Sequence, residues 1–162
     1  MHFALLVVYS ATIFLSAMLL FMVQPLVGKI LLPYLGGTPA VWNTCMVFFQ
    51  ALLLGGYYYA HRLKRVPSLK TQLIIQAVIL GLAIIPLSAF GFRVEMLAKT
   101  ILPTPTESNP IPWLLAVLLL TTGLPFFVVS TTAPLLQRWF AGTNHPAARD
   151  PYFLYAASNL GS

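Results

Sequence analysis

The chain has 162 residues, of which 59% are hydrophobic and only 7% charged, with a mean hydropathy of +0.85. A soluble domain carries roughly 25% charged residues, so this composition excludes an ordinary soluble protein and predicts an integral membrane protein with room for four or five spans of about 20 residues. The net charge of +6 lies in short segments beside apolar runs, which is typical of membrane topology and not of nucleic-acid binding.

The first span is predicted over residues 3–24, which contain no charged side chain. Residues 25–39 are rich in Pro and Gly, and we expect a short interfacial helix or a re-entrant turn there, with Lys29 reaching the headgroups. Thr38 is suited to cap the next helix and Pro39 to begin it. The second span is predicted over residues 41–60.

A basic segment follows the second span. Four of the nine basic residues fall within residues 61–70, namely Arg62, Lys64, Arg65 and Lys70. The positive-inside rule places this loop in the cytoplasm. If the N-terminus lies on the cytoplasmic side of the cell inner membrane, six basic residues lie inside, including Arg138 and Arg149. Three then lie outside, namely Lys29, Arg93 and Lys99. The sequence therefore predicts a multi-pass protein with a cytoplasmic N-terminus.

The remaining spans are predicted over residues 72–92, 113–136 and, incompletely, 152–162. Residues 93–112 between them are expected to form an exposed extracytoplasmic loop. The second half of the fourth span is rich in Gly, Pro, Ser and Thr and should be bent. The last run covers about half a membrane thickness. We expect an all-α, polytopic transmembrane helix bundle, an N-terminal fragment with four full spans and the start of a fifth.

Small residues four positions apart predict helix faces where a neighbouring backbone approaches closely. Such pairs are Ala51 with Gly55 and Gly56 with Ala60 in the second span, and Ala77 with Gly81 in the third.

No constellation of catalytic or metal-binding residues is found in the sequence. It has no Gly-rich phosphate loop, no paired His/Cys spacing and no His-Glu-x-x-His. The acids Glu95, Glu107 and Asp150 all lie between spans, and Asp150 is expected to cap the last helix. We therefore predict no catalytic residue, cofactor or metal site in this chain. Cys45 is the single cysteine, so an internal disulfide is excluded.

Amide side chains inside the spans are the candidates for a polar cavity. Asn43 and Gln50 are seven residues apart and share one face of the second span, and Gln76 lies in the third. Amides in spans commonly bridge helices and hydroxyls bond the carbonyl one turn back. A purely structural role is therefore the alternative to a substrate site.

Three stretches resemble a known family: QPLVGKILLPYLGGTPAVWNTCMVFFQALLLGGYYYAH, GLPFFVVSTTAPLLQRWF and DPYFLYAASNLGS. They are similar to the membrane half of bacterial fused major-facilitator/spermidine-synthase-like proteins, over residues 21–162. The stretch GYYYAHRLKR keeps the glycine and the final basic pair of the major-facilitator loop motif but has Ala60 in place of its acid.

The resemblance implies a major-facilitator-like bundle followed, in the complete protein, by further spans and a soluble Rossmann-type domain similar to aminopropyltransferases. The bundle would then anchor or position that domain, with the lipid bilayer, the remaining spans and the soluble domain as its partners. One alternative is that the chain forms part of a transporter for a small solute such as a polyamine. Another is a purely structural role, as a small membrane subunit complete as written. No nucleic-acid partner and no cofactor are expected.

Overall fold

The computed structural model describes residues 2–90 and 110–162, and every regular element within them is helical. The elements are α1 (His2–Leu35), α2 (Pro39–Leu63), α3 (Leu69–Phe90), α5 (Ile111–Leu118), the π-helix η1 (Leu119–Gly123), α6 (Leu124–Ala141), the 3-10 helix η2 (Pro146–Arg149) and α7 (Tyr152–Gly161). Most of the extracytoplasmic loop expected over residues 93–112 lies outside the described residues.

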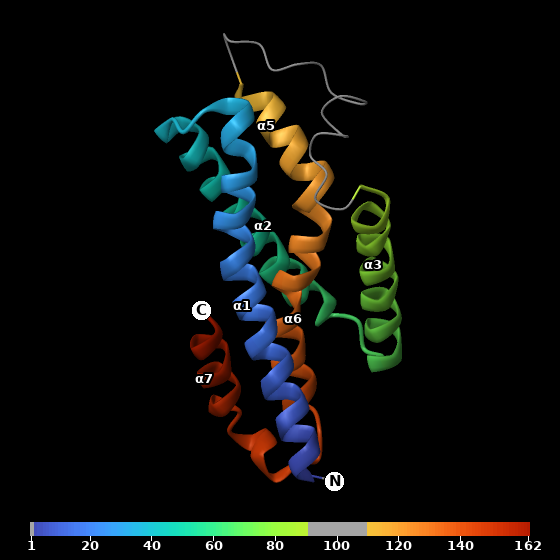
Figure 1. Cartoon of the computed structure of the whole chain (residues 1–162). Coiled ribbons are helices and arrows are strands. Elements are labelled where there is room, and N and C mark those ends of the chain that lie inside the picture. Colours follow the sequence, from blue (N-terminus) through green and yellow to red (C-terminus); the bar gives the residue numbers. More distant parts are fainter. Residues whose placement is uncertain (1, 91–109) are drawn as a thin grey trace.

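Three described helical stretches are long and apolar enough to cross a membrane: Phe3–Leu35, Pro39–Leu63 and Ile111–Ala141. A shorter apolar stretch, Leu69–Ile85, belongs to α3. Figure 1 shows that successive long helices run in alternating directions, as consecutive membrane spans do. The expectation of an all-helical fold with helices able to cross a membrane is therefore confirmed, by their length and composition.

Helix α1 does not stop at the predicted end of the first span. It continues through Pro25 and Pro33 to Leu35, so the separate interfacial helix or re-entrant turn expected after Gln24 is wrong. Helices that cross membranes tolerate proline because neighbouring groups satisfy the backbone carbonyl that proline leaves unbonded. The 34 residues of α1 extend over about 51 Å, which exceeds a hydrocarbon core of about 30 Å.

The break between α1 and α2 falls at Gly36. This residue has φ +72°, a backbone conformation that glycine adopts without steric cost, and its N–H donates to the Leu32 carbonyl at 2.9 Å. The predicted cap of α2 is confirmed, because the Thr38 hydroxyl accepts a hydrogen bond from the Val41 N–H at 3.4 Å and Pro39 opens the helix.

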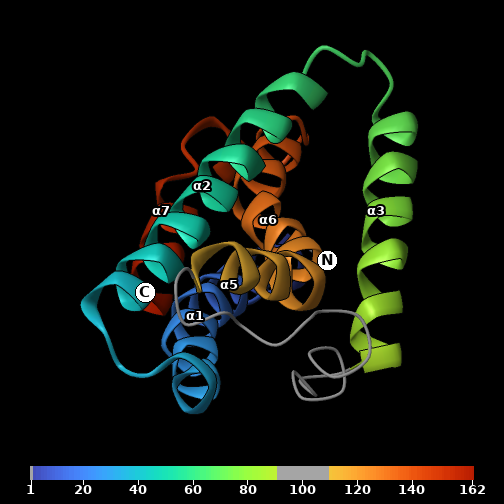
Figure 2. The same cartoon turned by 90° about the horizontal axis from the view of Figure 1, so that it is seen from above.

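Close packing of small residues occurs at one of the three predicted pairs. Gly56 and Ala60 are buried, and a Cβ added at Gly56 would overlap the Ser130 side chain of α6. At Ala51 and Gly55 the prediction is wrong, because Ala51 is exposed and a Cβ added at Gly55 would make only an ordinary contact, at 3.8 Å, with the Phe127 ring. The prediction is also wrong at the third pair. Ala77 and Gly81 are exposed, and a Cβ at Gly81 would meet nothing within 4 Å. Figure 2 shows why, since α3 stands at the edge of the bundle.

Helices α5, η1 and α6 form one continuous central helix whose direction changes near η1 (Figure 1). The irregularity has a local cause: Pro125 cannot donate to the Thr121 carbonyl, and a widened turn lets the helix pass it. The hydroxyls of Thr121 and Thr122 donate to the Val117 and Leu118 carbonyls at 2.7 and 2.9 Å. The bend expected in this span therefore begins at the π-helix.

The largest buried cluster joins the central helix to α1 and α2. The Phe49 and Phe126 rings lie 4.8 Å apart at its centre, and Leu114, Val117 and Leu118 are fully buried around them. A second cluster joins α7 to the first half of α1.

The last helix begins without the predicted cap. Its N-cap is Pro151 and no side chain bonds the exposed N–H groups, whereas Asp150 ends η2, so the expected role of Asp150 is wrong. A 3-10 turn ending at Arg149 sets the direction of the chain here, and the Leu154 N–H bonds the Pro151 carbonyl at 3.0 Å.

Candidate functional site

Two glutamines on one face of α3 connect that helix to its neighbours. Gln72 and Gln76 are four residues apart, so their side chains project from the same side of the helix. Gln72 is buried and Gln76 half-buried. Together with the groups they bond, they form what we call the amide network.

Gln76 bridges three helices. Its Nε2 donates to the Thr131 hydroxyl of α6 at 2.9 Å, and its Oε1 accepts from the Tyr59 hydroxyl of α2 at 3.2 Å. The Thr131 hydroxyl in turn donates to the Val128 carbonyl at 2.7 Å. Every polar atom of this amide therefore has a bonded neighbour, although Nε2 retains one further N–H.

Gln72 makes the equivalent bridge one turn nearer the start of α3. Its Oε1 accepts from the Trp139 indole N–H of α6 at 3.0 Å, and its Nε2 donates to the Val66 carbonyl in the α2–α3 loop at 2.7 Å. Both ends of the amide are thus fixed by segments distant in sequence.

Apolar side chains pack beside the amide network. Ala60, Leu63 and Leu135 form a buried cluster beside it, with Ile75 packed against them. Exclusion of water strengthens each hydrogen bond and makes loss of a partner costly. The network is suited to holding α3 against α6, and it contains no carboxylate, histidine, lysine or arginine side chain.

The three residues predicted to line a polar cavity do not lie together in the described part of the chain. Asn43 and Gln50 lie exposed on α2, away from Gln76, which bonds Tyr59 and Thr131 instead. Gln72 was missed as a candidate because it begins the predicted third span. The four-residue spacing between Gln72 and Gln76, which places both amides on one face of the helix, could have identified Gln72.

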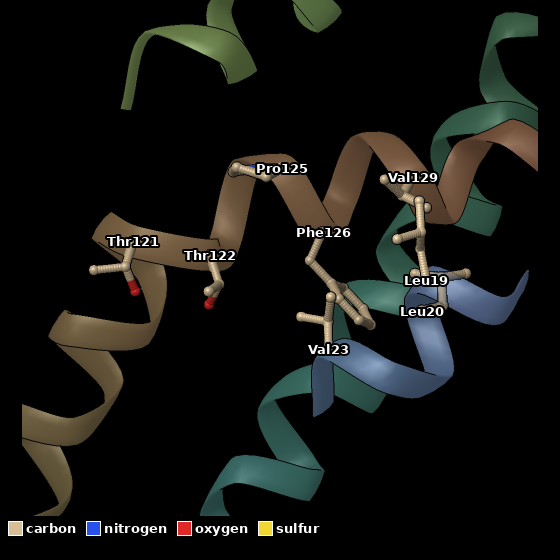
Figure 3. Close-up of a pocket in the computed structure, with 8 residues that line it drawn as sticks. All are labelled: Leu19, Leu20, Val23, Thr121, Thr122, Pro125, Phe126 and Val129. Atoms are coloured by element: carbon tan, nitrogen blue, oxygen red, sulfur yellow. The ribbon is translucent and has the colours of Figure 1, made fainter. Parts of the chain in front are cut away.

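A separate apolar pocket of about 140 Å³ lies between α1 and the central helix. Figure 3 shows Phe126 and Val129 pointing from α6 toward the α1 side chains, while the η1 threonines lie further along the same helix. The lining residues are Leu19, Leu20, Val23, Thr121, Thr122, Pro125, Phe126 and Val129. Because the threonine hydroxyls already bond backbone carbonyls, the pocket offers hydrocarbon contact and little polar recognition.

The basic residues predicted as a cytoplasmic loop, Arg62, Lys64, Arg65 and Lys70, are all exposed. Arg62 lies over the Tyr58 ring at 5.9 Å from its centroid, and Lys64 ends α2. The loop lies toward the same end of the molecule as the N-terminus and the η2 segment, whereas the turn at Gly36 lies at the opposite end (Figure 1). No group of three His, Cys, Asp or Glu side chains that could hold a metal occurs among the described residues.

The fold and these contacts define the class as an all-helical protein with helices able to cross a membrane. Comparison with protein-family models, with curated proteins and with solved structures gives no match to this chain.

Proposed function

We propose that this chain is part of the membrane domain of a multi-pass inner-membrane protein and that it anchors and positions an aminopropyltransferase-type soluble domain. In this proposal α1, α2, α3 and the central helix are four full spans of a major-facilitator-like bundle, and α7 begins a fifth. The soluble domain follows from the sequence resemblance given above.

The observation that supports an anchoring role is the use of the buried amides. Gln72 and Gln76 bond groups on other helices or loops at both ends, so they stabilise a fixed arrangement of α3 against α6. A transporter that handles a charged solute usually places an ionisable group inside a span, and the described helices hold none at mid-span. Both features favour a scaffold.

Charge supports the proposed orientation. The α2–α3 loop, the helix ends beside it and the η2 segment lie toward one end in Figure 1, and together they contain five of the seven Lys and Arg residues of the described chain, namely Arg62, Lys64, Arg65, Lys70 and Arg149. The positive-inside rule assigns such an end to the cytoplasm, where an aminopropyltransferase-type domain would meet soluble substrates.

The test has two stages. The coding frame past Ser162 is read first, and we expect further apolar spans and then a strand, a glycine-rich loop and a helix. In that full-length protein, aminopropyl transfer is then measured in membrane and soluble fractions, with and without residues 1–162. Activity should pellet with membranes when the spans are present and become soluble, with kcat retained, when they are removed. A frame without such a domain, or activity that does not follow the spans, would refute the proposal.

Transport of a small solute such as a polyamine is the second candidate, because Asn43 and Gln50 expose two amides on one face of α2. Uptake of labelled spermidine into membrane vesicles tests it. Loss of uptake in Asn43→Leu and Gln50→Leu with normal protein levels would favour transport over anchoring.

A further inference from the structure

Near its C-terminal end, α2 carries an arginine whose side chain is turned back along the helix. The guanidinium carbon of Arg62 lies 5.9 Å from the centre of the Tyr58 ring, one turn earlier in the helix. Both side chains are exposed. Tyrosine rings at the ends of membrane helices collect at the depth of the lipid headgroups. The contact with Tyr58 therefore holds the positive charge of Arg62 in the headgroup layer and not in the water beyond the helix.

The guanidinium of Arg62 has no anion within the described part of the chain, where it makes no side-chain hydrogen bond or ion pair. Residues 1–94 contain no Asp or Glu, and the charged residues that follow, Lys64 and Arg65, are cations. A guanidinium presents five N–H donors in a fixed fork that matches the oxygens of a phosphate. The anion that pairs with Arg62 therefore comes from outside the described residues, and a lipid phosphate is the anion found at this depth.

The same face of α2 leads from Arg62 into an apolar groove between α2 and α5. At 100° per residue, Tyr58, Ala51 and Val47 all lie within about 60° of Arg62 around the helix. The groove has a volume of about 390 Å³ and is lined by Asn43, Thr44, Val47, Phe48, Ala51 and Leu115. The Thr44 hydroxyl already donates to the Ala40 carbonyl at 2.8 Å. The end of the groove nearest Arg62, at Ala51, therefore offers hydrocarbon contact.

The length of this face matches one leaflet of a bilayer. At a rise of 1.5 Å per residue, Ala51 lies about 16 Å and Val47 about 22 Å from Arg62 along the helix axis. Half of a hydrocarbon core together with one headgroup layer measures about 20–22 Å. An acyl chain that descends from a phosphate at Arg62 therefore reaches the groove.

We propose that this face, which we call the Arg62 face (Arg62, Tyr58, Ala51 and Val47), binds an anionic phospholipid. The phosphate accepts hydrogen bonds from the guanidinium, and one acyl chain lies along the face into the groove. The neighbouring cations favour an anionic headgroup over a zwitterionic one, because no carboxylate in residues 1–94 could pair with a lipid amine. A protein helix on the same face would have to place a carboxylate opposite Arg62, whereas a phospholipid supplies the charge and the chain together.

Native mass spectrometry of the delipidated full-length protein tests the headgroup contact. The protein is titrated in detergent with dioleoyl phosphatidylglycerol and with dioleoyl phosphatidylcholine, which has the same chains, and the first should bind more tightly. Arg62→Gln should weaken binding of phosphatidylglycerol by about 5-fold. Lys64→Gln is the matched control, because Lys64 is an exposed cation two residues further on that points about 160° away around the helix. Its effect should be less than about 2-fold.

A second pair of variants tests the groove. Ala51→Leu fills the groove where the acyl chain enters and should weaken binding of both lipids by about 3- to 10-fold, the loss of contact with one or two methylene groups. Ala77→Leu makes the same change at an exposed alanine of α3 and should leave the binding of both lipids unchanged.

Four results would each overturn the proposal. Equal weakening by Arg62→Gln and Lys64→Gln would report diffuse attraction to the whole basic end. Displacement of the lipid by an equal concentration of glycerol 3-phosphate would report a site for free phosphate. Unchanged binding in Ala51→Leu would show that the groove holds no acyl chain. Equal binding of the two lipids, or no binding, would show that the Arg62 face has no anionic lipid, as when another segment of the protein covers it.

Discussion

Replacement of Gln76 by leucine is the sharpest test of the amide network. The change keeps the size of the side chain but removes two interhelical hydrogen bonds, to the hydroxyls of Tyr59 and Thr131. Hydrogen bonds between membrane helices average about 0.6 kcal/mol and reach about 1.7 kcal/mol. Thr131 keeps its bond to the Val128 carbonyl, whereas the Tyr59 hydroxyl loses its bonded neighbour. We expect the free energy of unfolding to fall by about 1–3 kcal/mol.

The assay is reversible unfolding in bicelles or mixed micelles, followed by tryptophan fluorescence. Gln24→Leu is the matched control, because Gln24 is a half-buried amide of α1 that makes no side-chain hydrogen bond in the described residues. It should change stability by less than about 0.5 kcal/mol. A double-mutant cycle of Gln76→Leu with Tyr59→Phe should give a coupling of about 0.5–1.5 kcal/mol. Equal stability of Gln76→Leu and the parent chain would refute the argument that the amide holds α3 in place.

Two further predictions concern packing and orientation. Gly56→Ala forces a methyl group against Ser130 and should destabilise the fold by about 1–3 kcal/mol. At Gly81 nothing lies within 4 Å of an added Cβ, so Gly81→Ala should be neutral or stabilising by up to about 1 kcal/mol. The same unfolding assay compares the two variants, and similar losses of stability would contradict the close approach of α2 and α6. With a cytoplasmic N-terminus, a membrane-impermeant maleimide should label Gly37→Cys in intact cells and Ser68→Cys only after permeabilisation, and the reverse pattern would invert the proposed topology.

The fold class could be predicted from the low charge content and the length of the uncharged apolar runs, because these decide whether a helix can cross a membrane. The start of α2 was also predictable, since Thr38 and Pro39 act through local backbone chemistry. The end of α1 was not. Proline at position 25 would end a helix in water, where its freed carbonyl partners can be hydrated, but the same residue is tolerated inside a long apolar helix.

The amide network was only half predictable, for a different physical reason. Gln76 was identified as an intramembrane amide, but its partners depend on how α2, α3 and α6 are rotated about their own axes. Around α3 the sequence is apolar on almost every side, so hydrophobic periodicity carries no information on which face turns inward. The shared face of Asn43 and Gln50 was correctly expected from their spacing, yet the spacing could not say that this face points away from Gln76.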